Sequence, residues 1–269
     1  MKMITRRWQR RAAMVPLVLL CAATAAAAPP ATSSGATDEV RPSADLDPTA
    51  VAALESMGAA LRKLESFSVR STSSVDVVLE TGQKVQLDQT INYRARRPDG
   101  LYVELESDRK HRRIYYDGQA LTVYSPRLDY YASVPTRARS LGDLVTNAGR
   151  DYGIALPLAD LFYWGTPDLP VAALSSAILI GPATVAGIKT EQYAFRQPGV
   201  DWQLWVASDS RLPQKIVITN VDDPALPEFR AELHWDTRTS VPASTFRFEP
   251  PKDAASIVLK LPAANGTTN

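Results

Sequence analysis

The chain has 269 residues, a formal net charge of +1, and 45% hydrophobic residues. Without the five cations of residues 1–27 the net charge is −4, and such a mildly acidic chain is a poor candidate for binding nucleic acid or anionic lipid headgroups. His111, His234 and one cysteine are too few for a zinc site of three or four ligands. We therefore expect no metal, no other cofactor and no nucleic-acid partner.

Residues 1–27 have the composition of a secretory signal peptide. Cations up to Arg11 precede an apolar run from Ala12 to Leu20, and the alanine-rich segment ATAAAAPP follows. The run is shorter than the ~20 residues of a membrane-spanning helix. Removal of the five cations in 1–27 changes the net charge from +1 to −4. We predict export to the periplasm, with residues 28–46 as a disordered linker rich in Pro, Ser, Thr and Ala.

Cys21 leaves an alternative, because a cysteine after a short apolar run is lipidated in lipoprotein signals. Those signals place a small residue before the cysteine, whereas Leu20 stands there in this chain. We favour soluble export, with lipid anchoring through Cys21 as the alternative. After cleavage the mature chain has no cysteine, so its stability depends on its core.

The segment 47–64 is predicted to form an amphipathic helix. Asp47 is a favourable N-cap, and Pro48 suits the first helical position, where no N–H is needed. Apolar residues then recur at three- and four-residue steps, as on one face of a helix. These residues are Val51, Leu54, Met57, Leu61 and Leu64.

After Phe67 the apolar residues alternate with polar ones, which predicts strands. A three-residue loop at Thr81–Gln83 would join two of them and pair Val77 with Leu87. Another strand, LYVELES, begins at Leu101 after the turn residues RPDG.

Residues 114–135, IYYDGQALTVYSPRLDYYASVP, contain five tyrosines. Asp117-Gly118 is typical of a two-residue hairpin loop, which would pair Tyr116 with Gln119 and Ile114 with Leu121. One face is then predicted to carry Ile114, Tyr116, Leu121 and Val123, and the other Tyr115 and Tyr124.

Residues 141–164 show helical spacing interrupted by Gly149, Gly153 and Pro157, which predicts two short helices. Alternating strands are expected at Ala177–Val185, Thr190–Arg196, Trp202–Ala207, Gln214–Val221 and Phe229–Asp236. The predicted class is α+β, a single antiparallel sheet with helices on one face. The folded domain spans 47–261, and 262–269 is predicted to be a disordered tail.

No motif for catalysis is found. The sequence contains no GxSxG elbow, phosphate-binding glycine loop or dinucleotide fingerprint. Asp222-Asp223 precedes Pro224, as in a solvated turn, and His234 lies in an alternating strand where exposure to solvent is expected. We predict that the protein is not an enzyme, with an undetected hydrolase as the remaining alternative.

Two basic clusters, RARRPDG and DRKHRR, lie beside predicted turns. We interpret them as solvated loops, with a docking patch for an anionic partner as the alternative.

The order of motifs resembles the periplasmic lipoprotein-carrier superfamily of LolA and LolB. The motifs are a helix ending in LRKLESFSV, a strand after RRPDGLYVEL, the hairpin YYDGQALTVYSPRLDYY, and the later WQLWVA, LPQKIVI and FRFEPP. Within that superfamily the chain most resembles predicted periplasmic proteins known only as a domain of unknown function. The resemblance implies an unclosed β-barrel, a strongly curved antiparallel sheet whose concave face is covered by helices. It also implies an apolar cavity for acyl chains between sheet and helices.

Strand parity then predicts the ligand-binding residues. On the concave face they are Val77, Leu87, Ile91, Val103, Ile114, Tyr116, Leu121, Val123, Leu204 and Leu233, and from the helical lid Leu144, Leu161 and Phe162. A core filled by the helices would show the same alternation, so each residue has that alternative.

The predicted function is that of a monomeric periplasmic carrier or sensor of a lipid or other hydrophobic ligand. The alternative is a regulatory or scaffold domain that contacts an envelope protein.

Overall fold

The computed structural model describes residues 45–164 and 171–259. The predicted signal peptide, Cys21, most of the predicted linker and the predicted tail lie outside these residues. In the described part, no helix combines the length and hydropathy that crossing a membrane requires.

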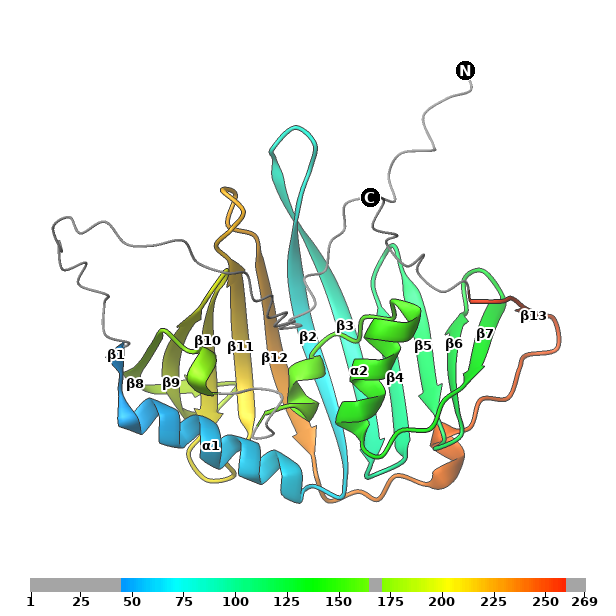
Figure 1. Cartoon of the computed structure of the whole chain (residues 1–269), viewed down its shortest axis with the longest axis horizontal. Helices are drawn as coiled ribbons and strands as arrows, with labels where there is room; N and C mark the ends of the chain where they lie inside the picture. Colours follow the sequence, from blue (N-terminus) through cyan, green and yellow to red (C-terminus); the bar gives the residue numbers. More distant parts are fainter. Residues whose placement is uncertain (1–44, 165–170, 260–269) are drawn as a thin grey trace, which may run out of the picture. The chain divides into compact units, whose positions relative to one another are not determined.

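The described elements are helices α1 and α2, three short 3-10 helices and thirteen strands (Figure 1). The helices are α1 Pro48–Lys63, α2 Leu141–Tyr152, η1 Ala159–Phe162, η2 Val171–Ala173 and η3 Ala243–Phe246. The strands are β1 Asp45–Leu46, β2 Ser66–Val78, β3 Lys84–Arg96, β4 Gly100–Glu106, β5 His111–Tyr116, β6 Ala120–Ser125, β7 Tyr130–Pro135, β8 Ser176–Val185, β9 Ile188–Gln197, β10 Val200–Ala207, β11 Pro213–Asn220, β12 Glu228–Asp236 and β13 Ala255–Ser256.

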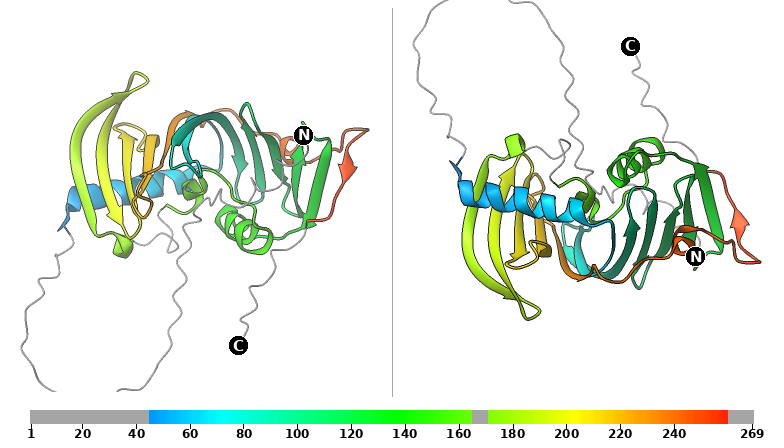
Figure 2. Two further views of the ribbon diagram at one scale, coloured as in Figure 1. Left: turned by 90° about the horizontal axis from the view of Figure 1, so that it is seen from above. Right: turned by 90° about the horizontal axis from the view of Figure 1, so that it is seen from below.

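All of these strands belong to one sheet, in the order β1-β8-β9-β10-β11-β12-β2-β3-β4-β5-β6-β7-β13. Neighbours pair antiparallel, except that the two-residue strands β1 and β13 pair parallel with β8 and β7. The two ends of the order are not paired with each other, and the sheet is curved (Figure 2). The predicted large, curved, unclosed antiparallel sheet is therefore confirmed, and it is accompanied by the two α-helices α1 and α2.

Helix α1 begins where the sequence predicts. The Asp47 carboxylate accepts the backbone N–H of Thr49 at 2.7 Å, and Pro48 is the first helical residue. The buried face comprises Ala50, Leu54, Met57, Gly58 and Leu61. These residues join the main apolar core, so α1 is stabilised by packing as well as by its cap.

Two arginines donate hydrogen bonds to backbone carbonyls. The Arg97 guanidinium donates to the carbonyls of Leu64 (3.1 Å) and Leu61 (3.4 Å) at the end of α1. Arg127 donates to the carbonyl of Ser107 at 2.7 Å. This bond holds the turn between β4 and β5, which contains the first residues of the DRKHRR cluster. The interpretation of RARRPDG as a wholly solvated loop was wrong at Arg97, because a helix leaves its last carbonyls without partners.

The β2–β3 hairpin has a different register from the predicted one. Val77 pairs with Val85, not with Leu87, and the three-residue loop is Glu80–Gly82. Gly82 has φ 81°, the left-handed conformation that a three-residue hairpin loop needs at its last position. The error is two residues, so each side chain keeps its predicted face.

The β5–β6 hairpin shows the same kind of difference. Tyr116 pairs with Leu121, so the predicted pairing with Gln119 was wrong. The Asp117 carboxylate accepts the N–H groups of Gln119 and Ala120, both at 3.0 Å, which widens the loop. The predicted division of faces is kept, because the shift is again two residues.

The predicted pair of short helices is present in altered form. Helix α2 continues through Gly149 and ends at Gly153, whose φ of 64° suits a helix C-cap. The second helix is the four-residue 3-10 helix η1.

The C-terminal segment after β12 crosses the face of the sheet opposite α2 (Figure 2). Phe246 lies so close to Gly100 that a Cβ there would be 2.6 Å from its ring. Phe248 contacts the rings of Tyr115, Tyr124 and Tyr131, with centroid distances of 5.3, 5.5 and 4.9 Å. The tyrosines predicted on this second face therefore form an aromatic cluster with the FRFEPP motif.

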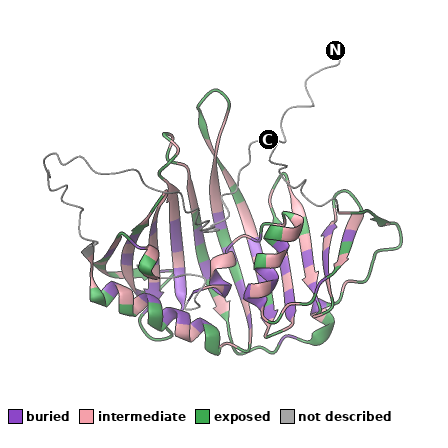
Figure 3. Ribbon diagram, viewed as in Figure 1, coloured by how far each residue is buried: buried purple, intermediate pink, exposed green. Residues whose placement is uncertain are grey.

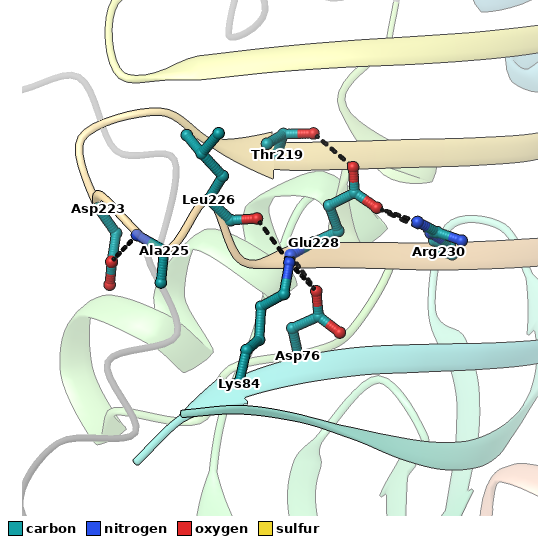
Figure 4. A network of polar contacts seen from close by, with 8 residues as sticks. All are labelled: Asp76, Lys84, Thr219, Asp223, Ala225, Leu226, Glu228 and Arg230. Atoms are coloured by element: carbon teal, nitrogen blue, oxygen red, sulfur yellow. Dashed lines mark hydrogen bonds and ion pairs between the residues drawn. The ribbon is translucent and has the colours of Figure 1, made fainter. Parts of the chain in front are cut away.

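A polar network joins the β2–β3 hairpin to the β11–β12 hairpin (Figure 4). The Asp76 carboxylate accepts the backbone N–H of Glu228 at 3.1 Å and lies 3.1 Å from Nζ of Lys84. Lys84 also donates to the carbonyl of Leu226 at 3.3 Å, and the Glu228 carboxylate binds Arg230. These contacts connect segments about 150 residues apart in sequence.

Candidate functional site: the inner face and its lid

The face of the sheet that packs on the helices is called the inner face, and the opposite one the outer face. Adjacent strands place apolar residues of the inner face side by side. One such row is Trp235, Val69, Tyr93, Val103, Ile114 and Val123. Figure 3 shows buried positions recurring along these strands. The period of two in the sequence thus produces one continuous apolar surface.

Most predicted ligand-binding residues lie in this surface or in the helices against it. Ten are buried in one apolar core: Ile91, Val103, Ile114, Tyr116, Leu121, Leu144, Leu161, Phe162, Leu204 and Leu233. Val123 is half-buried against the same core. Val77 and Leu87 are half-buried near the β2–β3 loop and are outside the core cluster. The structure therefore brings eleven of the thirteen together.

Residues 138–164, which include α2 and η1, are called the lid. Ser140 caps α2 by accepting the N–H of Asp143 at 3.1 Å. The next turns bury Leu141, Leu144, Val145 and Ala148. Leu156, Leu158, Leu161, Phe162 and Trp164 continue the buried set after the helix. The lid contributes its apolar side chains to the same core as the inner face.

Phe162 is the central aromatic contact between lid and sheet. Its ring centroid lies 5.8 Å from that of Tyr93 and 6.3 Å from that of Phe67. On the other half of the sheet, Trp202 stacks on Phe195 at 4.2 Å and lies 6.5 Å from Trp164 of the lid. The lid therefore meets the sheet through aromatic side chains from β2, β3 and β10.

Two buried tyrosines of the inner face hold the lid by their hydroxyl groups. The Tyr116 hydroxyl accepts the backbone N–H of Ala138 at 3.0 Å, before α2. The Tyr93 hydroxyl donates to the carbonyl of Pro157, after α2. Because these bonds bracket α2, the lid is fastened to the sheet at both ends.

Asp160 is the acidic group of the lid nearest this core. Burial raises the pKa of its carboxyl to about 6. Burial also raises the pKa of the Tyr93 hydroxyl, and the nearby charge of Asp160 adds to that effect. The lid therefore contains a group that changes charge slightly below neutral pH.

Two polar atoms of the inner face are buried without a hydrogen-bond partner among the residues described here. They are the Ser71 hydroxyl and the indole nitrogen of Trp202.

Trp202, Tyr93, Phe67 and Phe195 were not among the predicted site residues. They follow the same strand alternation, so aromatic residues at the inner-face positions of the predicted strands are the sequence signal that could have identified them.

In residues 45–164 and 171–259, no three His, Cys, Asp or Glu side chains are grouped as a metal site would need. His111 instead lies 3.0 Å from the Glu104 carboxylate, which also accepts from Arg113 at 2.8 Å. His234 is exposed, as predicted.

The described residues thus form one curved sheet whose apolar inner face packs on a lid fastened at both ends of α2. The sequence matches the family model described as "Predicted periplasmic protein (DUF2092)" over residues 50–260. The chain belongs to this family, which confirms the predicted membership of a periplasmic family of unknown function. The sequence matches none of the curated proteins.

Several solved structures are similar. Lipoprotein LppX of Mycobacterium tuberculosis is 14% identical, and the alignment covers 73% of this chain and 100% of LppX with a TM-score of 0.46. MucB is 14% identical, with 76% of this chain and 64% of MucB covered and a TM-score of 0.45. A LolA superfamily protein of Nitrosomonas europaea, NE2245, is 13% identical, with 74% and 97% covered and a TM-score of 0.33. The chain thus spans less than two thirds of MucB.

Proposed function

We propose that the protein is a periplasmic carrier or sensor that binds a lipid or other hydrophobic ligand between the inner face and the lid, without catalysis. In this proposal the helices cover the concave face of the sheet, and a single ligand is bound by one monomer. The observation that carries the proposal is an apolar inner face closed by a lid that two tyrosine hydroxyls fasten.

The ligand is taken up when the lid moves away from the sheet. Side chains of lid and sheet fill the space between them, so an acyl chain replaces lid contacts such as those of Phe162. Burial of each methylene stabilises the complex by about 0.8 kcal/mol, so a chain of about fifteen methylenes contributes roughly 12 kcal/mol before the cost of opening the lid. Partial burial of such a chain is therefore sufficient.

The test is titration with an environment-sensitive fluorescent fatty acid. Leu121→Asp places a carboxylate at a fully buried position of the inner face and should abolish uptake with partial loss of stability. Val123→Asp changes a half-buried position and keeps more of the native stability, and it should weaken uptake at least tenfold.

Ser133→Asp is the matched control, because Ser133 is exposed and its hydroxyl bonds Thr122 on the outer face. It adds the same charge and should bind the probe like the wild type. Unchanged uptake by a folded Val123→Asp protein would contradict the assignment of the inner face.

A regulatory or scaffold role remains the second candidate, and one feature favours it. Strand β8 lies near one edge of the sheet, with β9 along one side. Along its other side it pairs, among the described residues, only with the two-residue strand β1. Ile178 and Ile180 on β8 are 43% and 55% exposed. An open strand edge with exposed apolar residues can accept a strand from another protein. Crosslinking from a photoreactive residue at position 180 in the periplasm tests this role, and it fails if no envelope protein is captured.

A further inference from the structure

The outer face contains a groove of about 550 Å³, whose lining also includes Val69 and Tyr93 of β2 and β3. Its floor is formed by Ser68 and Arg70 of β2 and by Asn92 and Arg94 of β3. The C-terminal segment forms a second side, and the N–H of Val241 donates to the Ser66 hydroxyl at 3.3 Å beside the start of β2. The groove is therefore built from two parts of the chain far apart in sequence.

The cations of the groove are available to a ligand. Arg70 and Arg94 are both exposed, and neither forms an ion pair with any residue that the structure describes. The Arg94 guanidinium lies 5.6 Å from the ring centroid of Tyr102, which orients it over the outer face. Register places Arg70 opposite Asn92 and Ser68 opposite Arg94, so the two guanidinium groups lie on adjacent strands among polar side chains.

The carboxylates of the groove already have partners. Glu104 is hydrogen-bonded by His111 and Arg113. Burial tends to raise its pKa, but these two donors outweigh burial and the pKa is lowered. The Asp236 carboxylate accepts the N–H groups of Arg238 (3.0 Å) and Thr239 (3.1 Å). Glu104 is paired with the Arg113 cation, whereas Asp236 accepts only neutral N–H groups and keeps its charge. Arg70 and Arg94 together with Asp236 therefore leave a net charge of +2 − 1 = +1 in the groove.

Hydroxyl groups add neutral donors around these cations. Thr239, Ser240 and Thr245 line the groove from the C-terminal segment, together with Ser68 from the floor. Guanidinium and hydroxyl groups together match a tetrahedral oxoanion, which accepts several hydrogen bonds at once. The volume exceeds that of a bare anion and leaves space for an attached group against Val241 and Pro242.

We propose that this outer groove binds a phosphate ester, with Arg70 and Arg94 on the phosphate and the hydroxyl groups of the C-terminal segment on its remaining oxygens. Two sources share this chemistry: a soluble phosphorylated small molecule and the headgroup of a phospholipid at a membrane surface. The site is on the face opposite the proposed lipid site, and it does not depend on ligand uptake by the inner face.

The experiment uses three probes at low ionic strength, where charge interactions are least screened. Inorganic phosphate and glycerol 3-phosphate are titrated while the side-chain Nε–Hε signals of the arginines are followed by NMR. Vesicles of phosphatidylglycerol with phosphatidylcholine are tested by cosedimentation. We expect saturable shifts of Arg70 and Arg94, or vesicle binding, and at least a tenfold loss of affinity in Arg70→Gln/Arg94→Gln.

Arg112→Gln is the matched control, because Arg112 pairs in register with Leu105 on the inner face and is exposed. It removes a cation from β5, which β4 separates from β3, and should leave every affinity unchanged. Loss of soluble-probe binding in the double variant supports a soluble phosphate ester, and loss of vesicle binding alone supports a headgroup. The proposal is overturned if no probe binds saturably, or if the double variant binds all probes as the wild type does.

Discussion

Removal of the Tyr93 and Tyr116 hydroxyls should loosen the lid without unfolding the sheet. Phenylalanine keeps each ring, which is almost completely buried, and deletes only the hydrogen bond to the lid backbone. The N–H of Ala138 and the carbonyl of Pro157 each lose their partner. The perturbation therefore acts at both ends of α2 and at no other described contact of the lid.

The expected size follows from the two bonds. A hydrogen bond contributes about 1 kcal/mol net, and up to about 3 kcal/mol when the remaining partner stays buried without another. For Tyr93→Phe/Tyr116→Phe we expect roughly 2 kcal/mol in the free energy of lid opening, which corresponds to an opening constant about 30-fold larger. If uptake requires lid opening, the association rate of a fluorescent fatty acid should rise by a similar factor.

Amide hydrogen exchange measures this opening directly. Amides of α2 should exchange about 30-fold faster in the double variant, while amides of the β2–β3 ladder keep their protection. Tyr131→Phe is the control, because Tyr131 lies on the outer face against Phe248. Equal acceleration throughout the sheet, or an unchanged rate for α2, would refute the account of the lid as a separately opening unit.

Two further predictions concern charged groups. Burial raises the folded-state pKa of Asp160 to about 6 from 3.8. The free energy of unfolding is therefore higher below about pH 4, where the carboxyl is protonated in both states, and it falls as the pH rises through 6. Asp160→Asn should therefore be more stable than the wild type at pH 7.5, by at most about 3 kcal/mol, with a smaller difference at pH 4, as measured by urea unfolding; a larger advantage at pH 4 would contradict the sign. Asp76→Ala leaves the N–H of Glu228 without its acceptor and should lower the unfolding free energy by about 2 kcal/mol, whereas Lys84→Met, at a side chain 40% exposed, should lower it by less than about 1 kcal/mol. Thermal unfolding compares these two variants, and equal losses would contradict the importance of the buried carboxylate.

The faces of the strands could be predicted from the sequence because alternation alone determines them. Ile114, Tyr116 and Leu121 share the inner face as predicted, although their hairpin register differs. A two-residue change of register conserves the side-chain face, so apolar alternation does not distinguish the two registers. The side chain of Asp117 decides between them by binding two backbone N–H groups of the loop.

The covering of the outer face could not be predicted in the same way. Tyr115 and Tyr124 were assigned to the second face, but their contact with Phe248 joins segments more than 120 residues apart. The groove with Arg70 and Arg94 depends on that same crossing of the C-terminal segment. Local periodicity contains no information about such long-range contacts, and β7 was missed because Tyr130 and Tyr131 follow a loop without an alternating pattern of sufficient length.

The inner face is proposed to bind a hydrophobic ligand. Native mass spectrometry of the protein purified from its own periplasm tests it most directly. We expect a protein ion with an additional mass that dissociates as one lipid or other hydrophobic molecule, and the loss of this mass in Val123→Asp but not in Ser133→Asp. The proposal would be contradicted if the wild type is found only without ligand and the Tyr93→Phe/Tyr116→Phe variant also takes up none from a lipid extract.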